Sequence, residues 1–467
     1  MTDAYRPGGY AAASERIIRD EPTMRTAVTG AARSKDERRQ AAWAQIDADA
    51  WRDWARDLKS HVLTHLDRYL EEAEDRLVQN GVHVHWAETA EEACRVVARI
   101  AEAHDARRIV KAKSMLTEEV GLNTHLEALG LDVRETDLGE FIIQLLGEPP
   151  SHIVGPSLHR SLDDCRRLFH ERFGTPLDAS PEALAATARQ VLRDDFLQAD
   201  LGVSGANFLV AETGTIALIE NEGNIRISTS IPKVHVALVG IEKIVPKLED
   251  LAGMIQLTAR SATGQPIGNY TSLIQGPRRP GERDGPDEVH VVFVDNGRTG
   301  LLADEHAWEV LRCVRCGACL NICPVYRQTG GHAYGWAYSG PIGAILAPGI
   351  LGLEESMPLP FASSLCGACA DVCPVRIPIP ELLVYWRERA AEEGLVPRTD
   401  AMAMKAWATL AEHPELFGAA AGALGAVPLK RVGRMLPVLR GWVEEREAPV
   451  ASRKRFLDNR STKEEGT

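Results

Sequence analysis

Long apolar runs and export signals are missing from this sequence. The two most apolar stretches, "GPIGAILAPGILGL" and "FGAAAGALGAVPL", are shorter than the roughly 20 residues needed to cross a bilayer, and glycine and proline interrupt both. The first residues, "MTDAYRPGGYAAASERIIRDEPTM", lack an apolar core flanked by basic residues, so neither a secretory signal nor a transit peptide is expected. We therefore expect a cytoplasmic protein with no transmembrane segment. A peripheral position at the inner face of the membrane is the alternative, because residues 428–460 are locally basic.

An excess of positive charge is also absent. The net charge is −13 over 467 residues, which argues against nucleic acid as a partner. With 45% hydrophobic and 25% charged residues the composition is that of a globular protein, and the length predicts two or three domains. The sequence lacks a G-x-G-x-x-G fingerprint for a flavin or nicotinamide, because "GVSGAN" at 202–207 has neither that spacing nor a suitably placed acidic residue.

Cysteine is scarce outside one segment. Of nine cysteines, only Cys94 and Cys165 lie outside residues 313–373, and we expect both to be small helix-packing residues. Disulfides are rare in a reducing cytoplasm, so the clustered cysteines are expected to be metal ligands. The stretch "RCVRCGACLNICPVY" has the C-x2-C-x2-C-x3-C-P spacing of bacterial cubane iron–sulfur clusters, formed by Cys313, Cys316, Cys319 and Cys323.

A second stretch, "FASSLCGACADVCPVRIP", repeats this spacing with one ligand missing, because Ser363 stands where its first cysteine would be. In two-cluster ferredoxins the last cysteine of each run binds the other cluster. Three outcomes stay open at the Ser363 corner: a 3Fe-4S cluster, a 4Fe-4S cluster with an oxygen ligand, or a cubane completed by another residue. Zinc is the alternative for the whole set, but two runs ending in Cys-Pro favour iron and sulfide. The assignment is Cys313, Cys316, Cys319 and Cys373 for the first cluster, and Cys323, Cys366 and Cys369 for the second.

The rest of the chain reads as helices, then an α/β domain, then the cysteine module. Residues 34–80 have helical apolar spacing, and the following segments alternate as strands with helices between them, which predicts a largely parallel sheet. The expected strands are "VHVHWA" (82–87), "RRIVKAKS" (107–114), "LDVRETDL" (131–138), "SHIVGPS" (151–157), "FLVAETGTIALIENEG" (208–223), "VHVALVGIEKIV" (234–245) and "VHVVFVDNGR" (289–298). The segment between the cysteine groups is rich in glycine and aromatic residues and is expected to be irregular. The predicted domains are an N-terminal helical extension (1–59), the α/β domain (60–295), the dicluster domain (296–395) and a helical, basic C-terminal segment (396–467).

The chain resembles the lactate utilization protein B family. The resemblance rests on the seven-cysteine pattern, on "GGHAYGWAYSGPIGAILAP" and "GWVEEREAPVASRKRF", and on polar runs such as "AETGTIALIENEGN". It implies an α/β LUD domain with a fold similar to the ribose-phosphate isomerase, glucosamine-phosphate deaminase and CoA-transferase group. A mainly α-helical, ferredoxin-like dicluster domain and a helical C-terminal segment would follow. It also implies two partners, a LutA-like cysteine-rich subunit and a LutC-like LUD protein.

Within the LUD domain we expect a ligand pocket that binds a carboxylate. Lysine supplies a counter-charge and a Gly-Thr turn supplies backbone amides. "ETG" also resembles the position of the CoA-transferase nucleophile, although Glu212 is more simply expected to cap a strand end. His332 is expected to be a packed loop histidine or to shield a cluster. The candidate pocket residues are Lys111, Lys113, Glu212, Thr213, Gly214 and Thr215.

Together these features predict an electron carrier. Without a hydride cofactor, an iron–sulfur protein takes electrons from a partner and passes them on. The resemblance implies a subunit of L-lactate oxidation to pyruvate, with a quinone or cytochrome as acceptor. Two alternatives are a ferredoxin-like subunit of another 2-hydroxy-acid or glycerol-phosphate oxidising complex, and a LUD-domain acyl- or sugar-processing enzyme with redox-sensing clusters.

Overall fold

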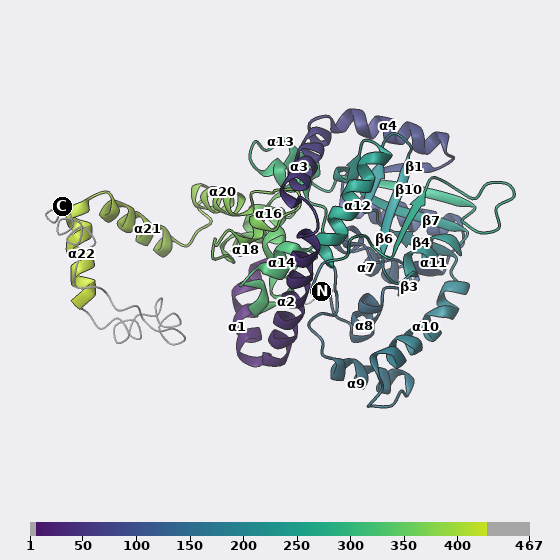
Figure 1. Ribbon diagram of the computed structural model, residues 1–467, viewed down its shortest axis with the longest axis horizontal. Helices are drawn as coiled ribbons and strands as arrows, with labels where there is room; N and C mark the ends of the chain where they lie inside the picture. Colours follow the sequence, from purple (N-terminus) through teal and green to yellow (C-terminus); the bar gives the residue numbers. More distant parts are fainter. Residues whose placement is uncertain (1–5, 427–467) are drawn as a thin grey trace. The chain divides into compact units, whose positions relative to one another are not determined.

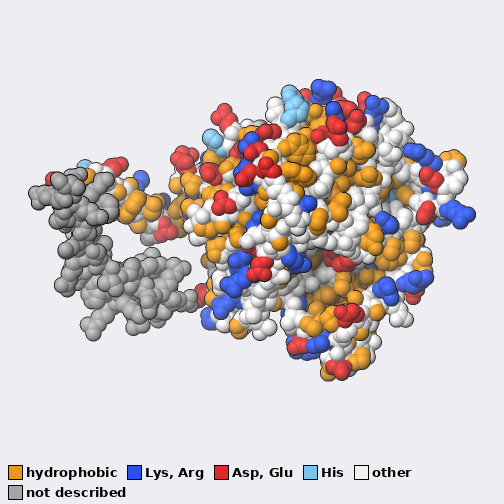
Figure 2. All heavy atoms as spheres, viewed as in Figure 1, with side chains coloured by type: hydrophobic (Ala, Val, Ile, Leu, Met, Phe, Trp, Pro, Cys, Tyr) orange, Lys and Arg blue, Asp and Glu red, His pale blue; other side chains and the backbone are white. Residues whose placement is uncertain are grey.

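The computed structural model describes residues 6–426. The chain divides into two compact units, of which the first ends at Ala390 and the second begins at Ala391. The basic stretch 428–460 lies outside the described residues. Among the residues described, none of the helices has the length and apolar character that a membrane span requires. Acidic, basic and hydrophobic side chains are interspersed on the face of the first unit seen in Figure 2.

A six-stranded parallel sheet forms the centre of the first unit (Figure 1). All five strand pairs run parallel, which confirms the expected α/β fold. The central strand β7 is buried along its whole length, as strands of a parallel sheet covered on both faces are. In spatial order the strands are β1 (His83–Ala87), β10 (Glu288–Val294), β7 (Val234–Gly240), β4 (Leu201–Ser204), β2 (Arg108–Lys111) and β3 (Asp132–Glu135).

Helices cover both faces of this sheet. Alternate residues of a strand point to opposite faces, so Val236 and Leu238 pack in one core cluster and Ala237 and Val239 in another. The first cluster includes apolar residues of α5 (Ala90–Ala103), α6 (Met115–Glu119) and α7 (Leu122–Ala128). The second includes residues of α3 (Ala48–Thr64) and α4 (Leu66–Gln79). A third cluster joins α8 (Leu138–Leu146), α9 (Leu162–Phe173) and α10 (Pro181–Leu197).

A smaller sheet lies in the same unit. It contains β8 (Ile244–Val245), β5 (Phe208–Val210), β6 (Thr215–Glu220) and β9 (Tyr270–Ile274), and β5 and β6 form an antiparallel hairpin. The expected strand at 151–157 is wrong. This segment is irregular because its polar groups bond elsewhere: the Ser151 N–H donates to the Pro156 carbonyl at 3.0 Å, and the Ser151 carbonyl accepts from the Tyr326 hydroxyl at 2.8 Å.

The cysteine segment is built from short helices. The expectation of an irregular segment between the cysteine groups is wrong in part, because α16 is an eleven-residue helix with nine buried residues. The elements are α13 (Arg298–Ala303), η3 (Ala307–Arg312), α14 (Ala318–Ile322), α15 (Tyr326–Thr329), η4 (His332–Tyr334), α16 (Gly340–Ile350), α17 (Leu353–Ser356), α18 (Pro358–Phe361), α19 (Ala368–Asp371) and α20 (Ile379–Glu392).

The N-terminal helices join the two parts of the first unit. Helix α2 (Pro22–Trp43) packs against α12 (Leu248–Ala262) of the α/β domain and against α14 and α15 of the cysteine segment. Figure 1 shows α2 beside α14, and α1 (Tyr10–Asp20) packs against α2 and α15. The remaining short elements of this unit are η1 (Pro7–Gly9), α11 (Asn224–Ser230) and η2 (Ile241–Lys243), and the second unit contributes α21 (Arg398–Ala411) and α22 (Pro414–Ala426).

Candidate iron–sulfur and ligand sites

The first predicted cysteine set lines a single cavity. Arg315 and Gly317 adopt positive φ angles of 60° and 74°, and these turns wind the chain around Cys316 before α14 begins. Two thiols accept backbone hydrogen bonds: Cys313 from the Arg315 N–H at 3.3 Å and Cys373 from the Ile377 N–H at 3.3 Å. The four cysteines around the cavity are Cys313, Cys316, Cys319 and Cys373.

The chemistry of this set fits a metal cluster. Burial raises the pKa of the Cys373 thiol to about 11, and the neighbouring Cys313 raises it further toward the neutral form. The pKa of Cys316 is also raised, by burial and then by Cys313 and Cys373. Converging thiols that resist ionisation by themselves become good ligands once a cation neutralises their charge, and soft thiolates select iron–sulfur clusters or zinc. The residues present therefore fit the expected group.

The second cysteine loop repeats the geometry of the first with an oxygen in place of one sulfur. Leu365 and Gly367 have positive φ angles of 54° and 85°, at the same loop positions as Arg315 and Gly317. The Ser363 hydroxyl accepts a hydrogen bond from the Leu365 N–H at 3.1 Å, just as the Cys313 thiol accepts one from Arg315. Ser363 thus takes the same place in its loop as the first cysteine of the complete motif.

The second set is more exposed than the first. Cys366 is exposed, whereas Cys323 and Cys369 are buried. Burial raises the pKa of Cys369 to about 12, and Cys323 and Cys366 add to this shift, so the three thiols lie close enough to interact. Leu365, next to Cys366, is 38% exposed. This loop therefore reaches the surface of the first unit.

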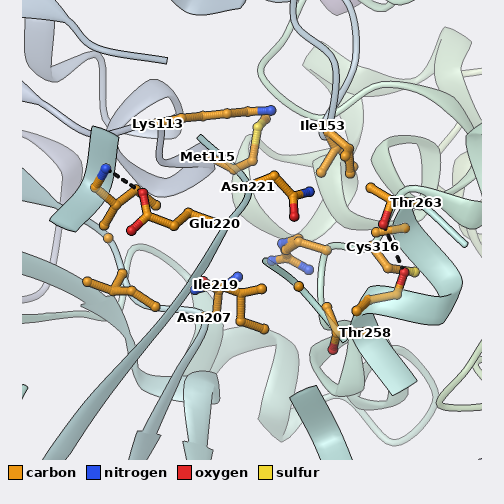
Figure 3. Close-up of a pocket in the computed structure, with 18 of the residues that line it drawn as sticks. Lys113, Met115, Ile153, Asn207, Ile219, Glu220, Asn221, Thr258, Thr263 and Cys316 are labelled. Atoms are coloured by element: carbon orange, nitrogen blue, oxygen red, sulfur yellow. Dashed lines mark hydrogen bonds between the residues drawn. The ribbon is translucent and has the colours of Figure 1, made fainter. Parts of the chain in front are cut away.

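A larger cavity, of about 370 Å³, lies at the carboxyl ends of the parallel strands. We call it the strand-end cavity. Lys113 follows β2, Gly205–Asn207 follow β4, and Lys243 follows β7, and all of these residues line it. Ligands of open α/β sheets bind at this end of the strands. In Figure 3, Lys113 and Glu220 lie at one side of the cavity and Cys316 at the other.

The first cysteine loop forms a wall of the strand-end cavity. Val314, Arg315 and Cys316 line it, and Arg315 also lines the cavity of the first cysteine set. The cavity of the α/β domain therefore extends to a predicted cluster ligand, Cys316. The sequence gives no sign of this contact, because the two segments are about two hundred residues apart.

Charged groups of both signs face the strand-end cavity. Burial, and then the Arg315 charge, lowers the pKa of Lys243 to about 8, and burial with Arg38 and Lys113 lowers that of Lys35 to about 8. Burial and the neighbouring Asp137 raise the pKa of the Glu222 carboxyl to about 7. The cavity therefore has groups that exchange protons near neutral pH.

A buried ionic network ties the α/β domain to the first cysteine loop. The Arg298 guanidinium donates to Glu119 Oε2 at 2.8 Å and to Glu242 Oε2 at 2.7 Å. Arg315 Nη2 lies 3.3 Å from Glu242 Oε1. Burial alone would raise the pKa of Glu242, but Arg298 and Arg315 lower it to about 2. Glu242 is thus held as a carboxylate between two guanidinium groups.

The six candidate pocket residues are not brought together. Lys113 lines the strand-end cavity, but the Lys111 ammonium is fully buried between Glu135, at 2.8 Å, and Glu118, at 3.0 Å. The Glu212–Thr215 turn lies at the end of α4, where the Asn80 amide donates to the Thr213 carbonyl at 2.9 Å. A Cβ on Gly214 would come within 2.8 Å of the Leu77 nitrogen, so this turn packs on helix backbone.

His332 packs in its loop. Its Nε2 donates to the Pro149 carbonyl at 2.8 Å, and its ring lies 4.4 Å from that of His159. The outlying cysteines are in helices: Cys94 is buried in α5 and Cys165 half-buried in α9.

The cavity residues that reasoning from the sequence missed are Arg315, Lys243 and Thr258. Arg315 alone carried a signal, since it lies inside the cysteine motif.

Three family models match the chain in succession. A LUD domain matches residues 70–294, a 4Fe-4S dicluster domain residues 309–377, and a lactate utilisation protein B C-terminal model residues 390–465. A DUF162 family protein from Deinococcus radiodurans, of known structure, matches with 17% identity and a TM-score of 0.28, over 49% of this chain and 98% of its own. The family models alone define the class, which is that of LUD-domain proteins with a 4Fe-4S dicluster domain.

Curated relatives match along almost the whole chain. Lactate utilization protein B of Shouchella clausii is 43% identical, covering 93% of both chains, and that of Geobacillus thermodenitrificans is 45% identical, covering 88% of this chain and 87% of its own. Escherichia coli has a relative named uncharacterized electron transport protein YkgF, 43% identical over 94% of this chain and 93% of its own. The chain belongs to the lactate utilization protein B family.

Proposed function

We propose that this chain is the iron–sulfur electron-transfer subunit of an L-lactate oxidation system. The observation that carries the proposal is the convergence of four cysteines with cubane spacing around one cavity. The choice of lactate as the substrate of the system is supported by the relatives named lactate utilization protein B. A LutA-like and a LutC-like partner deliver the electrons, and a quinone or cytochrome receives them.

The proposed ligands form two sets. Cys313, Cys316, Cys319 and Cys373 hold a 4Fe-4S cluster, and Cys323, Cys366 and Cys369 hold a second cluster whose fourth corner faces Ser363. One-electron transfer is the chemistry that such clusters supply when bound. The backbone N–H groups of Arg315 and Ile377 donate to the sulfurs of Cys313 and Cys373. These hydrogen bonds stabilise negative charge on sulfur and tune the reduction potential of the cluster.

Anaerobic electron paramagnetic resonance tests this proposal. The reconstituted protein is mixed with its two partners and then with L-lactate, and reduction of the clusters is expected only in the complete mixture. Glycolate and glycerol 3-phosphate serve as matched substrates, because reduction by either of them in place of L-lactate would assign the chain to another complex. Unchanged spectra in the full mixture with L-lactate would refute the role in lactate oxidation.

A further inference from the structure

We propose that the strand-end cavity binds a small monocarboxylic acid, whose carboxylate sits on the guanidinium of Arg315 beside the first cysteine set. The inference rests on the proposed function only in treating that set as a redox centre. In this inference the α/β domain of this chain recognises the acid, and it does so through residues other than the predicted Glu212–Thr215 turn.

Unsatisfied buried donors point to the ligand. The Arg315 side chain is 7% exposed, and only its Nη2 has a polar partner, Glu242 at 3.3 Å. Among the described residues, Arg315 Nε and Nη1 and the Thr258 hydroxyl have no hydrogen-bond partner. All belong to residues that line the strand-end cavity, although each atom is itself shielded from solvent, so a ligand reaches it through a shift of the side chains around it. Leaving a buried polar group unpaired costs about 1–3 kcal/mol. Nη1 shares an edge of the guanidinium with Nη2, and through the second N–H of Nη2 this edge can donate two parallel bonds to a carboxylate.

The ring of Tyr338 fixes the orientation of this guanidinium. Arg315 Cζ lies 4.6 Å from the Tyr338 ring centroid, and both residues line the cavity. The ion pair with Glu242 holds Nη2, at one corner of the group. A guanidinium held on one face and at one corner leaves its free N–H groups in a defined direction, which suits a planar carboxylate.

The distribution of charge selects a single negative charge. Four basic residues and three acidic residues line the cavity, so their formal charges sum to +1, which one monocarboxylate would balance: Lys35, Lys113, Lys243 and Arg315 against Asp137, Glu220 and Glu222. These carboxylates already accept backbone hydrogen bonds: Glu220 from Ile225 at 2.7 Å and Glu222 from Leu138 at 3.1 Å. They would repel the second charge of a dianion such as phosphate or a dicarboxylate. They tolerate an uncharged part of the ligand, such as the hydroxyl-bearing carbon of a 2-hydroxy acid.

Binding should couple to the first cysteine set. Cys316 shares the wall with Arg315, so a bound anion adds negative charge next to a centre that itself gains negative charge on reduction. The bound acid therefore lowers the reduction potential of that centre. By thermodynamic reciprocity, the oxidised protein binds the acid more tightly than the reduced protein by the same factor.

Isothermal titration of the reconstituted protein, without partners, tests the site. L-lactate and pyruvate are the probes, and inorganic phosphate and malonate are the dianionic comparison. We expect saturable binding of the monocarboxylates, about 10-fold or more weaker binding in Arg315→Lys, and about 3- to 10-fold weaker binding in Thr258→Val. Lys247→Ala is the control, because Lys247 is 60% exposed and pairs with Glu249. Iron content is measured in every variant.

The outcomes separate this inference from the proposed function. Absence of monocarboxylate binding at full iron content overturns the inference, as does unchanged affinity in both Arg315→Lys and Thr258→Val. Tighter binding of phosphate than of L-lactate overturns the choice of a monoanion. If L-lactate binds and shifts the potential but never reduces the clusters with both partners present, the site stands and the role in lactate oxidation fails.

We also propose a divalent-metal site at the amino ends of the strands, on independent evidence. His104 Nε2 lies 3.4 Å and His290 Nε2 3.6 Å from Glu288 Oε2, and these three atoms lie within 4.8 Å of one another. Ligands at zinc bond lengths of about 2.0–2.1 Å lie about 3.4 Å apart in a tetrahedron. The ring of His83 stacks on that of His290. The proposed ligands are therefore His104, Glu288 and His290, and water would complete the coordination.

The surroundings of His290 favour a metal over a simple ion pair. His290 Nε2 is buried and has no hydrogen-bond partner within residues 6–426. Its Nδ1 lies 3.1 Å from His85 Nε2. With the Nδ1 proton donated to His85, the Nε2 lone pair is left for the metal; His85 then takes the place that a carboxylate, carbonyl or water has beside other zinc-binding histidines.

Zinc titration of the iron-loaded protein tests this site. We expect wild type to bind one more equivalent of zinc than the His104→Ala/His290→Ala variant, at equal iron content. His65→Ala is the matched control, since that histidine is exposed and its ring packs on His61. Equal zinc stoichiometry in wild type and the double variant would refute the site, and loss of the extra equivalent in His65→Ala would do so as well.

Discussion

Replacing Glu242 with glutamine should destabilise the first unit measurably. The Glu242 carboxylate is 1% exposed and lies 2.7 Å from Arg298 Nε and 3.3 Å from Arg315 Nη2. Its pKa falls from the usual 4.5 to about 2, which corresponds to roughly 3 kcal/mol, because each pKa unit is worth about 1.4 kcal/mol. Removing one partner of a buried ion pair costs a similar ~3–5 kcal/mol.

The expected change in melting temperature follows from the size of the unit. Unfolding entropy is about 2.1 cal/mol/K per residue, so a unit that ends at Ala390 has about 0.8 kcal/mol/K, and a loss of 3 kcal/mol lowers Tm by about 4 °C. Scanning calorimetry of wild type and Glu242→Gln at equal iron content measures it. Glu249→Gln is the control, because Glu249 is 77% exposed. A shift below about 1 °C, or an equal shift in the control, would refute the reasoning.

The pH dependence of this difference has a definite sign. Glu242 has a lowered pKa in the folded protein, so its stabilisation is complete above its usual pKa of 4.5 and is lost as the pH falls toward 2. The Tm difference between wild type and Glu242→Gln should therefore be constant between about pH 6 and 8. A difference that changes steadily over this range would mean that another group, such as Lys243, carries the effect.

Three further substitutions test the two cysteine sets and the α/β domain. Cys373→Ser is expected to remove about half of the bound iron, whereas Cys165→Ser leaves the iron content unchanged, since Cys165 lies in α9. Ser363→Cys supplies a fourth thiol at the matching loop position, so any oxidised-state 3Fe-4S resonance signal of wild type should disappear in this variant and persist in Ser364→Cys. Glu212→Gln is expected to leave cluster reduction and stability unchanged within about 0.5 kcal/mol, because Glu212 is exposed and, within residues 6–426, its carboxylate accepts a hydrogen bond only from the Leu248 N–H, at 3.3 Å. Loss of a CoA-ester turnover in this variant would instead support an acyl-transfer enzyme.

The sequence predicts the strands whose apolar residues alternate regularly or run without interruption. Alternating or continuous apolar runs correctly indicated β1, β2, β3, β7 and β10. The short strand β4, "LGVS", was missed because glycine and serine weaken its pattern, and β9 was missed because much of it is exposed. The segment 151–157 has strand-like composition but lies against the cysteine module, whose contacts replace a strand partner.

The strand-end cavity was beyond prediction for a different reason. Its residues come from loops after separate strands, from α12 and from the cysteine loop, so no single period or motif contains them. Lys111 and Lys113 are two positions apart and look equivalent in sequence. Only the fold shows that Lys111 is fully buried among carboxylates while Lys113 faces the cavity.

The two cysteine sets differ in burial, which places the two ends of the proposed electron relay at different sites of the first unit. The first set lies against the strand-end cavity through Cys316, whereas the second includes the exposed Cys366 beside the 38% exposed Leu365. A small acid in the cavity and a protein partner at the exposed loop would therefore meet different sets. Under the proposed function, substituting Leu365 with aspartate should slow electron exchange with a partner and leave monocarboxylate binding unchanged. Arg315→Lys should weaken monocarboxylate binding and leave electron exchange with that partner unchanged. Rates of cluster reduction or oxidation with purified partners distinguish the two, and an equal effect of both variants on both measurements would contradict this spatial separation.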